Sequence, residues 1–149
     1  GDEIGDHLVK KGQEFGTVTK RKRRCGWFDS VLVGQSITIN GITDVVLTKL
    51  DVLDEITEIQ ICVGYKDDKN IYDYLPFDEN IQKKLVPIYE TLPGWQISTF
   101  GITSWSDLPI KAKNYIEFLE DKINTKISII STGPDRAHTI DRNNLLGNN

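Results

Sequence analysis

The clearest helical pattern in the chain lies between residues 106 and 123. Apolar side chains recur there at the three- and four-residue spacing of one helix face, and they are Leu108, Ala112, Tyr115, Ile116, Leu119 and Ile123. Ser106 and Asp107 precede this stripe, and polar side chains of these types cap helix N-termini. The pattern predicts an amphipathic helix that begins at Ser106–Asp107.

Two further segments are predicted to be helical. Residues 2–13 place Ile4, Leu8 and Val9 on one stripe, which is typical of a short amphipathic helix. Residues 27–39 are apolar with weak periodicity, which favours a helix packed against a sheet. The β-branched side chains at 36–39 leave a strand open as the alternative there.

Five short segments are predicted to be strands. Residues 45–48 form a continuous apolar run, the pattern of a strand covered on both faces. Residues 58–65 alternate between apolar and polar positions, and residues 71–75 follow a polar turn as the second arm of a hairpin. Residues 86–90 and 126–130 complete the set. A helix followed by a strand and a small-residue turn indicates an α/β fold.

Length and composition fit one globular domain and exclude several classes. The chain has 149 residues, of which 38% are hydrophobic and 27% charged, within the usual range for a single domain. No apolar run approaches the length needed to span a bilayer, and the charged first twelve residues do not resemble a secretory signal. The chain lacks Met and begins at Gly1, so we expect a processed chain or a segment of a longer protein.

Charge is distributed unevenly along the chain. The formal net charge is −4, but residues 20–24 hold five of the eighteen basic groups. Without them, 13 basic groups face 22 acidic ones. This asymmetry points to a local anion site more than to a nucleic-acid interface, which usually spreads positive charge over a broad patch.

The basic run belongs to a predicted loop at residues 16–24, GTVTKRKRR. Arginine presents a planar fork of donors that binds phosphate or carboxylate in a bidentate manner. Neighbouring threonine hydroxyls and backbone amides can complete a carboxylate pocket. A solvated basic loop and a localisation or RNA-binding patch remain as alternatives.

Two polar segments follow predicted strands. In the first, Thr48–Asp51, the Asp51 carboxylate can accept from the N1 and exocyclic amino hydrogens of guanine while the Lys49 stem covers the ring. The second is Ser131–Arg136. Ligands of open α/β sheets bind outside the carboxyl ends of strands, so the two segments can share one ligand. A capped strand end and an ordinary turn are the alternatives.

The histidines, cysteines and known catalytic motifs do not indicate a further site. His7 and His138 have no ligand partner at metal-binding spacing. Cys25 and Cys62 do not make a disulfide framework, and we expect inert thiols in a reducing cytoplasm. No nucleophile elbow, Walker loop or CxxC motif occurs in the sequence.

Four ordered blocks of the chain resemble adenylosuccinate synthetase. They are EFGTVTKRKRRCGWFD at 14–29, LTKLDVLD at 47–54, PIYETLPGW at 87–95 and ISTGPDR at 130–136. The resemblance implies a fragment of a three-layer α/β domain with a mainly parallel central sheet. It also implies a reaction in which IMP and L-aspartate are joined, with GTP hydrolysis, to give adenylosuccinate, GDP and phosphate.

The family enzyme is roughly three times longer than this chain. The resemblance therefore implies that residues 1–149 are a C-terminal segment, a single domain portion from which the N-terminal phosphate-loop part is absent. That missing part carries the family's general base, general acid and Mg²⁺ ligands. We expect no catalytic residue and no metal ligand in this segment, and no activity from it alone.

The resemblance assigns binding roles to three groups of residues. The aspartate loop corresponds to Thr17, Val18, Thr19, Lys20, Arg21, Lys22 and Arg23, with Arg21 contacting IMP. The GTP site corresponds to Arg23, Lys49, Leu50, Asp51, Ser131, Thr132 and Gly133. The loop departs from the family pattern at Val18 and Lys20, where the family has threonine and glycine. Val18 removes a hydroxyl, and Lys20 replaces a conformationally free glycine.

The implied partners are IMP, L-aspartate and GTP, with Mg²⁺ as cofactor, in a cytoplasmic homodimer. No nucleic acid and no membrane are expected as partners. A purine-nucleotide-binding remnant without turnover is the main alternative, and a protein that binds RNA through the basic loop is the other.

Overall fold

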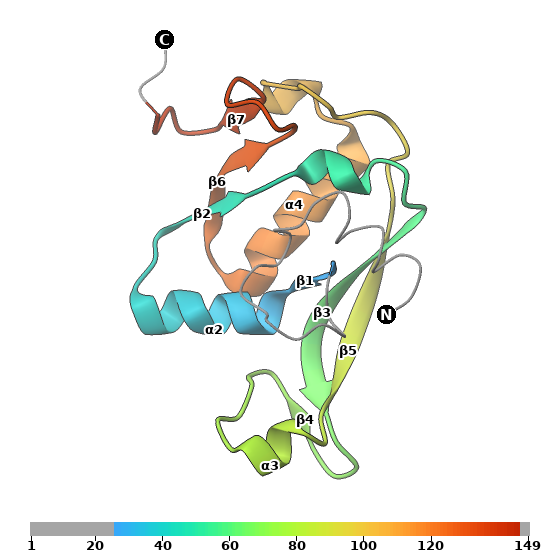
Figure 1. The fold of residues 1–149 in the computed structure, drawn as a ribbon, viewed down its shortest axis with the longest axis vertical. Helices are drawn as coiled ribbons and strands as arrows, with labels where there is room; N and C mark the ends of the chain where they lie inside the picture. The colour runs from blue at the N-terminus through green and yellow to red at the C-terminus, as the bar shows by residue number, and fades with distance from the viewer. Residues whose placement is uncertain (1–25, 147–149) are drawn as a thin grey trace.

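The computed structural model describes residues 26–146, which form two small sheets with helices packed beside them (Figure 1). The predicted helix at 2–13 and loop at 16–24 lie outside these residues. In chain order the elements are β1 Phe28–Asp29, α2 Ser30–Asn40, β2 Asp44–Leu47, the 3₁₀ helix η2 Leu50–Leu53, β3 Glu58–Lys66, β4 Ile71–Tyr72, α3 Glu79–Gln82, β5 Val86–Pro93, the 3₁₀ helix η3 Trp105–Asp107, α4 Ile110–Ile123, β6 Lys126–Ser131 and β7 Thr139–Asp141.

The predicted α/β class is confirmed, and both sheets are mixed. In the first sheet β3 pairs in parallel with β1 and antiparallel with β4 and β5. In the second, β6 pairs in parallel with β2 and antiparallel with β7. Parallel pairing was expected to dominate, but it accounts for two of these five pairs. The short returns from β3 to β4 and from β6 to β7 favour antiparallel neighbours, because a parallel neighbour needs a long crossover.

Helix α2 confirms the helix predicted at residues 27–39 from Ser30 onward, whereas Phe28 and Asp29 form β1. The strand alternative for 36–39 is wrong. The buried Asp29 carboxylate accepts hydrogen bonds from the backbone N–H groups of Val31 and Leu32, both at 3.0 Å. This is an N-cap, which satisfies donors that have no partner inside the helix. Gly41 ends the helix in the left-handed region with φ 65°, a conformation that favours glycine.

Helix α4 carries five of the six side chains of the predicted apolar stripe, and all six, including Leu108 just before the helix, are buried. Its start was predicted four residues too early, because Ser106 and Asp107 lie in η3 and the helix begins at Ile110. Pro109 explains the difference. A proline disfavours helical backbone at the residue before it, and Leu108 is extended with φ −69° and ψ 143°.

Strand β2 differs from the prediction that residues 45–48 are covered on both faces. Leu47 is buried, but Val46 is 56% exposed and Asp44 is also exposed. Among the described strands β2 pairs with β6 alone, so it lies at a sheet edge. Of the other predicted strands, 58–65, 86–90 and 126–130 are confirmed, with β5 extending to Pro93, whereas β4 covers only Ile71–Tyr72 of the predicted 71–75. Strands β1 and β7 and helices η2 and α3 were not predicted.

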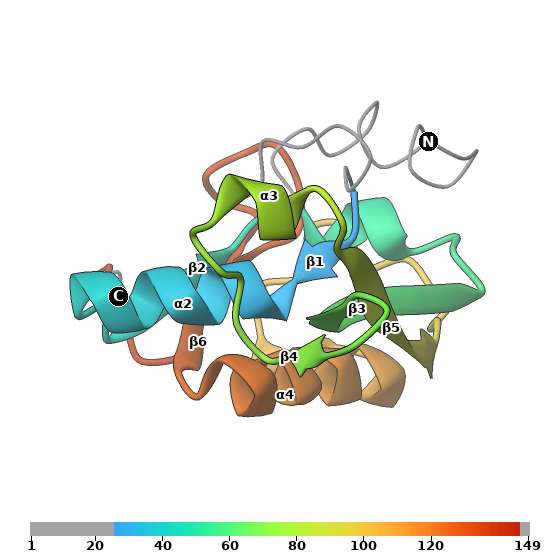
Figure 2. The same cartoon turned by 90° about the horizontal axis from the view of Figure 1, so that it is seen from below.

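The main core lies between α4, α2 and the two sheets (Figure 2). Helix α4 contacts both α2 and β6, and α2 contacts β3. The side chains that are fully buried in this core come from η2, β3, α4, β6 and β7, and include Leu50, Leu53, Ile59, Ile61, Ile116, Leu119, Ile127, Ile130 and Ile140. The packing fixes the carboxyl ends of β2 and β6 beside each other.

Tyr115 carries a prediction about stability. Its ring packs 5.7 Å from that of Trp95, and its buried hydroxyl makes no hydrogen bond within the described residues. Removing an unsatisfied buried hydroxyl stabilises a protein by about 1 kcal/mol, so Tyr115→Phe should raise the free energy of unfolding by that amount at pH 7. Thermal unfolding measures this change, and a lower unfolding temperature for the variant would contradict it.

The same side chain predicts a pH dependence. Burial raises the pKa of Tyr115 well above its ordinary value near 10. Above pH 10 the unfolded chain loses the hydroxyl proton of Tyr115 while the folded chain keeps it, so the free energy of unfolding falls as pH rises. Thermal unfolding between pH 8 and 11 should show a shallower loss for Tyr115→Phe than for the native sequence.

Candidate functional site

The carboxyl ends of β2 and β6 bring two of the predicted site segments together. The two strands pair in parallel, with Leu47 beside Ile130, so their ends open on the same edge of the sheet. The Lys49 backbone N–H donates a hydrogen bond to Ser131 Oγ at 2.6 Å. Residues 82 positions apart in sequence therefore form one continuous surface at the position where ligands of α/β sheets bind.

The chain turns sharply between β2 and η2 at Lys49. Its backbone is left-handed, with φ 57° and ψ 49°, which is uncommon for a residue with a side chain. This turn points the Lys49 N–H toward Ser131 and starts η2. Leu50 is then fully buried, whereas Asp51 is half-buried in the first turn of η2. The Leu50 side chain belongs to the core, so its backbone is the part available to a ligand.

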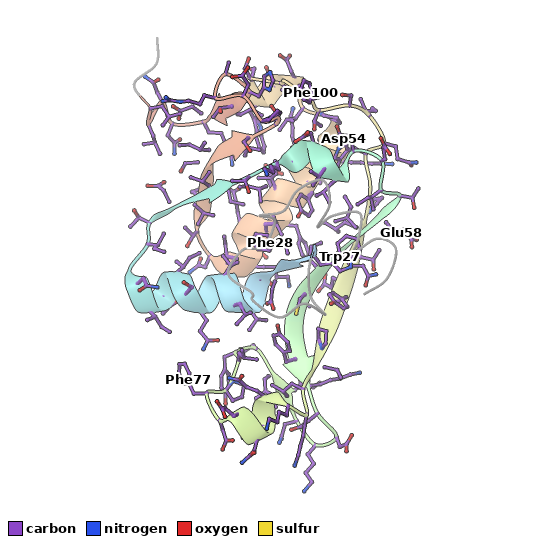
Figure 3. All side chains as sticks on the ribbon, in the orientation of Figure 1. Trp27, Phe28, Asp54, Glu58, Phe77 and Phe100 are labelled. Atoms are coloured by element: carbon purple, nitrogen blue, oxygen red, sulfur yellow. The ribbon has the colours of Figure 1, made fainter. Side chains whose placement is uncertain are left out.

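Asp54 fastens η2 to the loop after β5 (Figure 3). Its carboxylate accepts from Trp95 Nε1 at 2.7 Å, from the Thr99 backbone N–H at 2.8 Å and from Thr99 Oγ1 at 2.7 Å. Bonds to an ionised acceptor are stronger than bonds between neutral groups. This arrangement fixes the short helix that carries Asp51. No local sequence pattern indicates this role, because the groups that donate to Asp54 lie more than forty residues away in sequence.

The loop after β6 is closed by hydrogen bonds of the Thr132 main chain and hydroxyl. The Thr132 N–H donates to the His138 carbonyl at 2.8 Å, and Thr132 Oγ1 donates to the Ile102 carbonyl at 2.8 Å. The Gly101 N–H in turn donates to the Thr132 carbonyl at 3.0 Å. Thr132 is fully buried, so it serves as an internal anchor for the exposed residues 134–137.

Gly133 packs directly against the His138 ring. A Cβ atom at Gly133 would lie 2.3 Å from His138 Nδ1, a distance that real side chains do not tolerate. Glycine is therefore required at this position for close approach. The imidazole also contacts the ring of Phe100 edge-on, with centroids 4.8 Å apart. Sequence reasoning placed no role on Phe100 or His138, since neither belongs to a motif.

Six of the predicted site residues thus gather at one sheet edge: Lys49, Leu50, Asp51, Ser131, Thr132 and Gly133. The predicted aspartate-loop residues Thr17 to Arg23, and Cys25, lie outside the described residues. Cys62 is buried, and its thiol donates a hydrogen bond to the Gly64 carbonyl at 3.4 Å. The described residues hold no group of three or more His, Cys, Asp or Glu side chains arranged to bind a metal ion.

A rigid segment follows the predicted aspartate loop. Gly26, Trp27, Phe28 and Asp29 are all buried, and β1 pairs Phe28 with Ile61. The Tyr65 hydroxyl donates a hydrogen bond to the second carboxylate oxygen of Asp29. The chain leaving the loop is therefore held at the start of α2.

The polar groups at this sheet edge can bind the edge of a planar ring. Asp51 supplies a carboxylate acceptor, Ser131 a hydroxyl, and Lys49 a cationic side chain on a long apolar stem. A carboxylate recognises two adjacent N–H donors on a ring and rejects a ring that presents an acceptor there. This set suits recognition of a nucleotide base, whereas these six residues include no nucleophile paired with a general base.

Within the described residues, no helix is both long and apolar enough to cross a bilayer.

Comparison with known proteins gives consistent matches. The family model described as adenylosuccinate synthetase matches residues 1–140. An adenylosuccinate synthetase from Ehrlichia canis is 52% identical over 143 residues, covering 96% of this chain and 33% of the relative. One from Coxiella burnetii is 50% identical over 141 residues, covering 95% of this chain and 32% of the relative. This chain spans about a third of the length of these curated relatives.

A solved structure gives the same match. It is titled as fully ligated adenylosuccinate synthetase from Plasmodium falciparum, and it is similar to this chain with a TM-score of 0.81 at 38% identity. The match covers 94% of this chain and 34% of that one.

Proposed function

Because this chain belongs to the adenylosuccinate synthetase family, we propose that it is the C-terminal part of a GTP-dependent ligase. The complete enzyme joins IMP and L-aspartate to form adenylosuccinate and releases GDP and phosphate. This chain spans about a third of its curated relatives. We assign the phosphate loop, the general base and the general acid to the preceding two thirds.

The role of the described site is to recognise the guanine of GTP. The observation that supports it is the 2.6 Å hydrogen bond from the Lys49 N–H to Ser131 Oγ, since it joins the two loops that resemble the family's guanine site. Asp51 accepts from N1 and the exocyclic amino group, and the Lys49 stem covers one face of the ring. The backbone of Leu50 and the loop Ser131, Thr132 and Gly133 complete the site.

The basic loop holds the other two substrates. Arg21 contacts IMP, Arg23 reaches GTP and aspartate, and Thr17 to Arg23 closes over aspartate. Fixed cations suit this task, because phosphorylation of the IMP 6-oxygen creates a phosphate that the aspartate amine then displaces. The Asp29–Tyr65 contact holds the chain that follows this loop, at the start of α2.

Mg²⁺ does not fit the described residues, which gather no set of three candidate ligands. We assign its ligands to the preceding part of the complete enzyme and route no step through the ion here. The complete enzyme is proposed to act as a cytoplasmic homodimer.

A turnover assay tests this function. The protein from its native source is sized by intact mass, and GDP release is measured with IMP, aspartate or GTP omitted in turn. The proposal predicts a chain about three times this length and GDP release that requires both other substrates. A native chain of 149 residues that binds purine nucleotides without turnover would overturn it. Salt-sensitive RNA binding with no preference for mononucleotides would also overturn it.

A further inference from the structure

We infer that His138 is a positioning residue for the loop of Ser131, Thr132 and Gly133. Its imidazole ring fixes the loop backbone at the place from which it packs against the guanine base. This inference rests on the proposed function and adds a residue that lies beyond the ISTGPDR block.

The first support is the close contact between His138 and Gly133. A Cβ built on Gly133 would lie 2.3 Å from Nδ1, 2.9 Å from Cγ and 3.1 Å from Cβ of His138. The imidazole therefore occupies the space where any other residue at 133 would place its side chain. With the ring in place, the loop backbone cannot shift toward it. Without the ring, that side of Gly133 has no support.

The His138 main chain holds the same loop from its other end. Its carbonyl accepts from the Thr132 N–H at 2.8 Å and from Thr132 Oγ1 at 3.3 Å. Its N–H donates to the Asp135 carbonyl at 2.9 Å. One residue thus braces Thr132 through its backbone and Gly133 through its ring.

Phe100 packs against the imidazole ring of His138. The two rings meet edge-on with centroids 4.8 Å apart, although Phe100 is 55% exposed. Its neighbours Thr99 and Gly101 are fastened to Asp54 and to Thr132. The brace therefore links the loop after β6 with the helix that carries Asp51.

The contact acts through shape. His138 Nδ1 is buried and makes no hydrogen bond within the described part of the chain. The nitrogen that faces Gly133 therefore contributes volume there, and the ring's effect on the loop comes from packing. Loss of the ring should weaken nucleotide binding without removing any group that reacts.

The test uses the complete enzyme. His138→Ala should raise KM for GTP roughly tenfold, which is within the usual range of coupling between two residues in contact, here His138 and Gly133. It should leave kcat and the KM values for IMP and aspartate within about twofold. Phe100→Ala should raise KM for GTP in the same direction by a smaller factor. It also serves as the second variant if His138→Ala does not fold.

Phe77→Ala is the matched control. Phe77 is 81% exposed and lies at the opposite end of the structure from Phe100 (Figure 3). Its removal should change none of the kinetic constants. Equal increases of all three KM values in His138→Ala would indicate general loosening of the fold and would overturn the inference, as would an unchanged KM for GTP.

A double-mutant cycle separates packing from independent effects. Gly133→Ala should raise KM for GTP strongly beside His138 and several-fold less in the His138→Ala background, because the clashing ring is gone. Additive effects would overturn the inference. If the unmodified complete enzyme shows no GTP-dependent turnover, the proposed function itself fails. Normal turnover with an insensitive His138→Ala defeats the positioning role alone.

Discussion

Replacing Asp51 with Asn in the complete enzyme is expected to lower kcat/KM for GTP about a hundredfold. The carboxylate accepts two N–H donors of guanine in the proposed complex. An amide in its place sets an NH₂ group against one of those donors. One charge-assisted bond is lost, and the guanine N–H and the asparagine NH₂ face each other without an acceptor. Hydrogen bonds to charged groups contribute about 1.5–3 kcal/mol each, which gives this magnitude.

The same variant should gain activity with XTP. Xanthine keeps the N1–H donor and carries an oxygen where guanine has its amino group, so the asparagine NH₂ finds an acceptor. Steady-state kinetics with GTP and XTP measure both changes. Asp121→Asn, an exposed position on α4, is the matched control and should behave like the native sequence. An unchanged preference for GTP in Asp51→Asn would contradict the guanine assignment.

Gly94→Ala is expected to lower the free energy of unfolding by about 3 kcal/mol, the upper range for overpacking a filled site. Gly94 is buried, and a Cβ there would lie 1.7 Å from the Ile56 carbonyl oxygen and 2.9 Å from its carbon. The contact is with backbone, so no side chain can rotate away. The Gly94 N–H also donates a hydrogen bond to the Thr57 carbonyl at 2.8 Å, which holds the chain after β5 against the chain before β3.

Gly34→Ala is the control, and we expect it to change stability in the opposite direction. Gly34 lies inside α2, and its added Cβ would meet Ile123 Cα at 3.8 Å, an ordinary contact. Alanine in a helix interior is favoured over glycine by about 0.5–1 kcal/mol, so this variant should be more stable. Chemical denaturation measures both. Equal effects of the two substitutions would contradict the packing described around Gly94.

The sequence predicted the elements whose patterns are local and periodic. The stripe of α4 repeats over four turns, and the helix forms with all those side chains buried. Its first residue was misjudged, since the conformation before Pro109 outweighs the capping chemistry of Ser106 and Asp107. Strand β2 was read as doubly covered, because an apolar run does not reveal which neighbours a strand acquires.

The types of residue in the candidate site could be predicted from the sequence, but their arrangement in space could not. Polar residues at two strand ends indicated a shared ligand, and the Lys49–Ser131 hydrogen bond places those ends together. The supports of the site were missed. Asp54 bonds across more than forty residues, and the contact of His138 with Gly133 depends on a turn whose shape is set by Thr132. Such contacts follow from tertiary packing, which no local pattern contains.

The central claim is that the joined ends of β2 and β6 hold guanine. A crystal structure of the complete enzyme with GDP bound tests it most directly. The account predicts guanine N1 and the exocyclic nitrogen within hydrogen-bond distance of the Asp51 carboxylate, with the Ser131–Gly133 loop against the ring. GDP bound with its base elsewhere, and Asp51 in contact with solvent or protein alone, would contradict it.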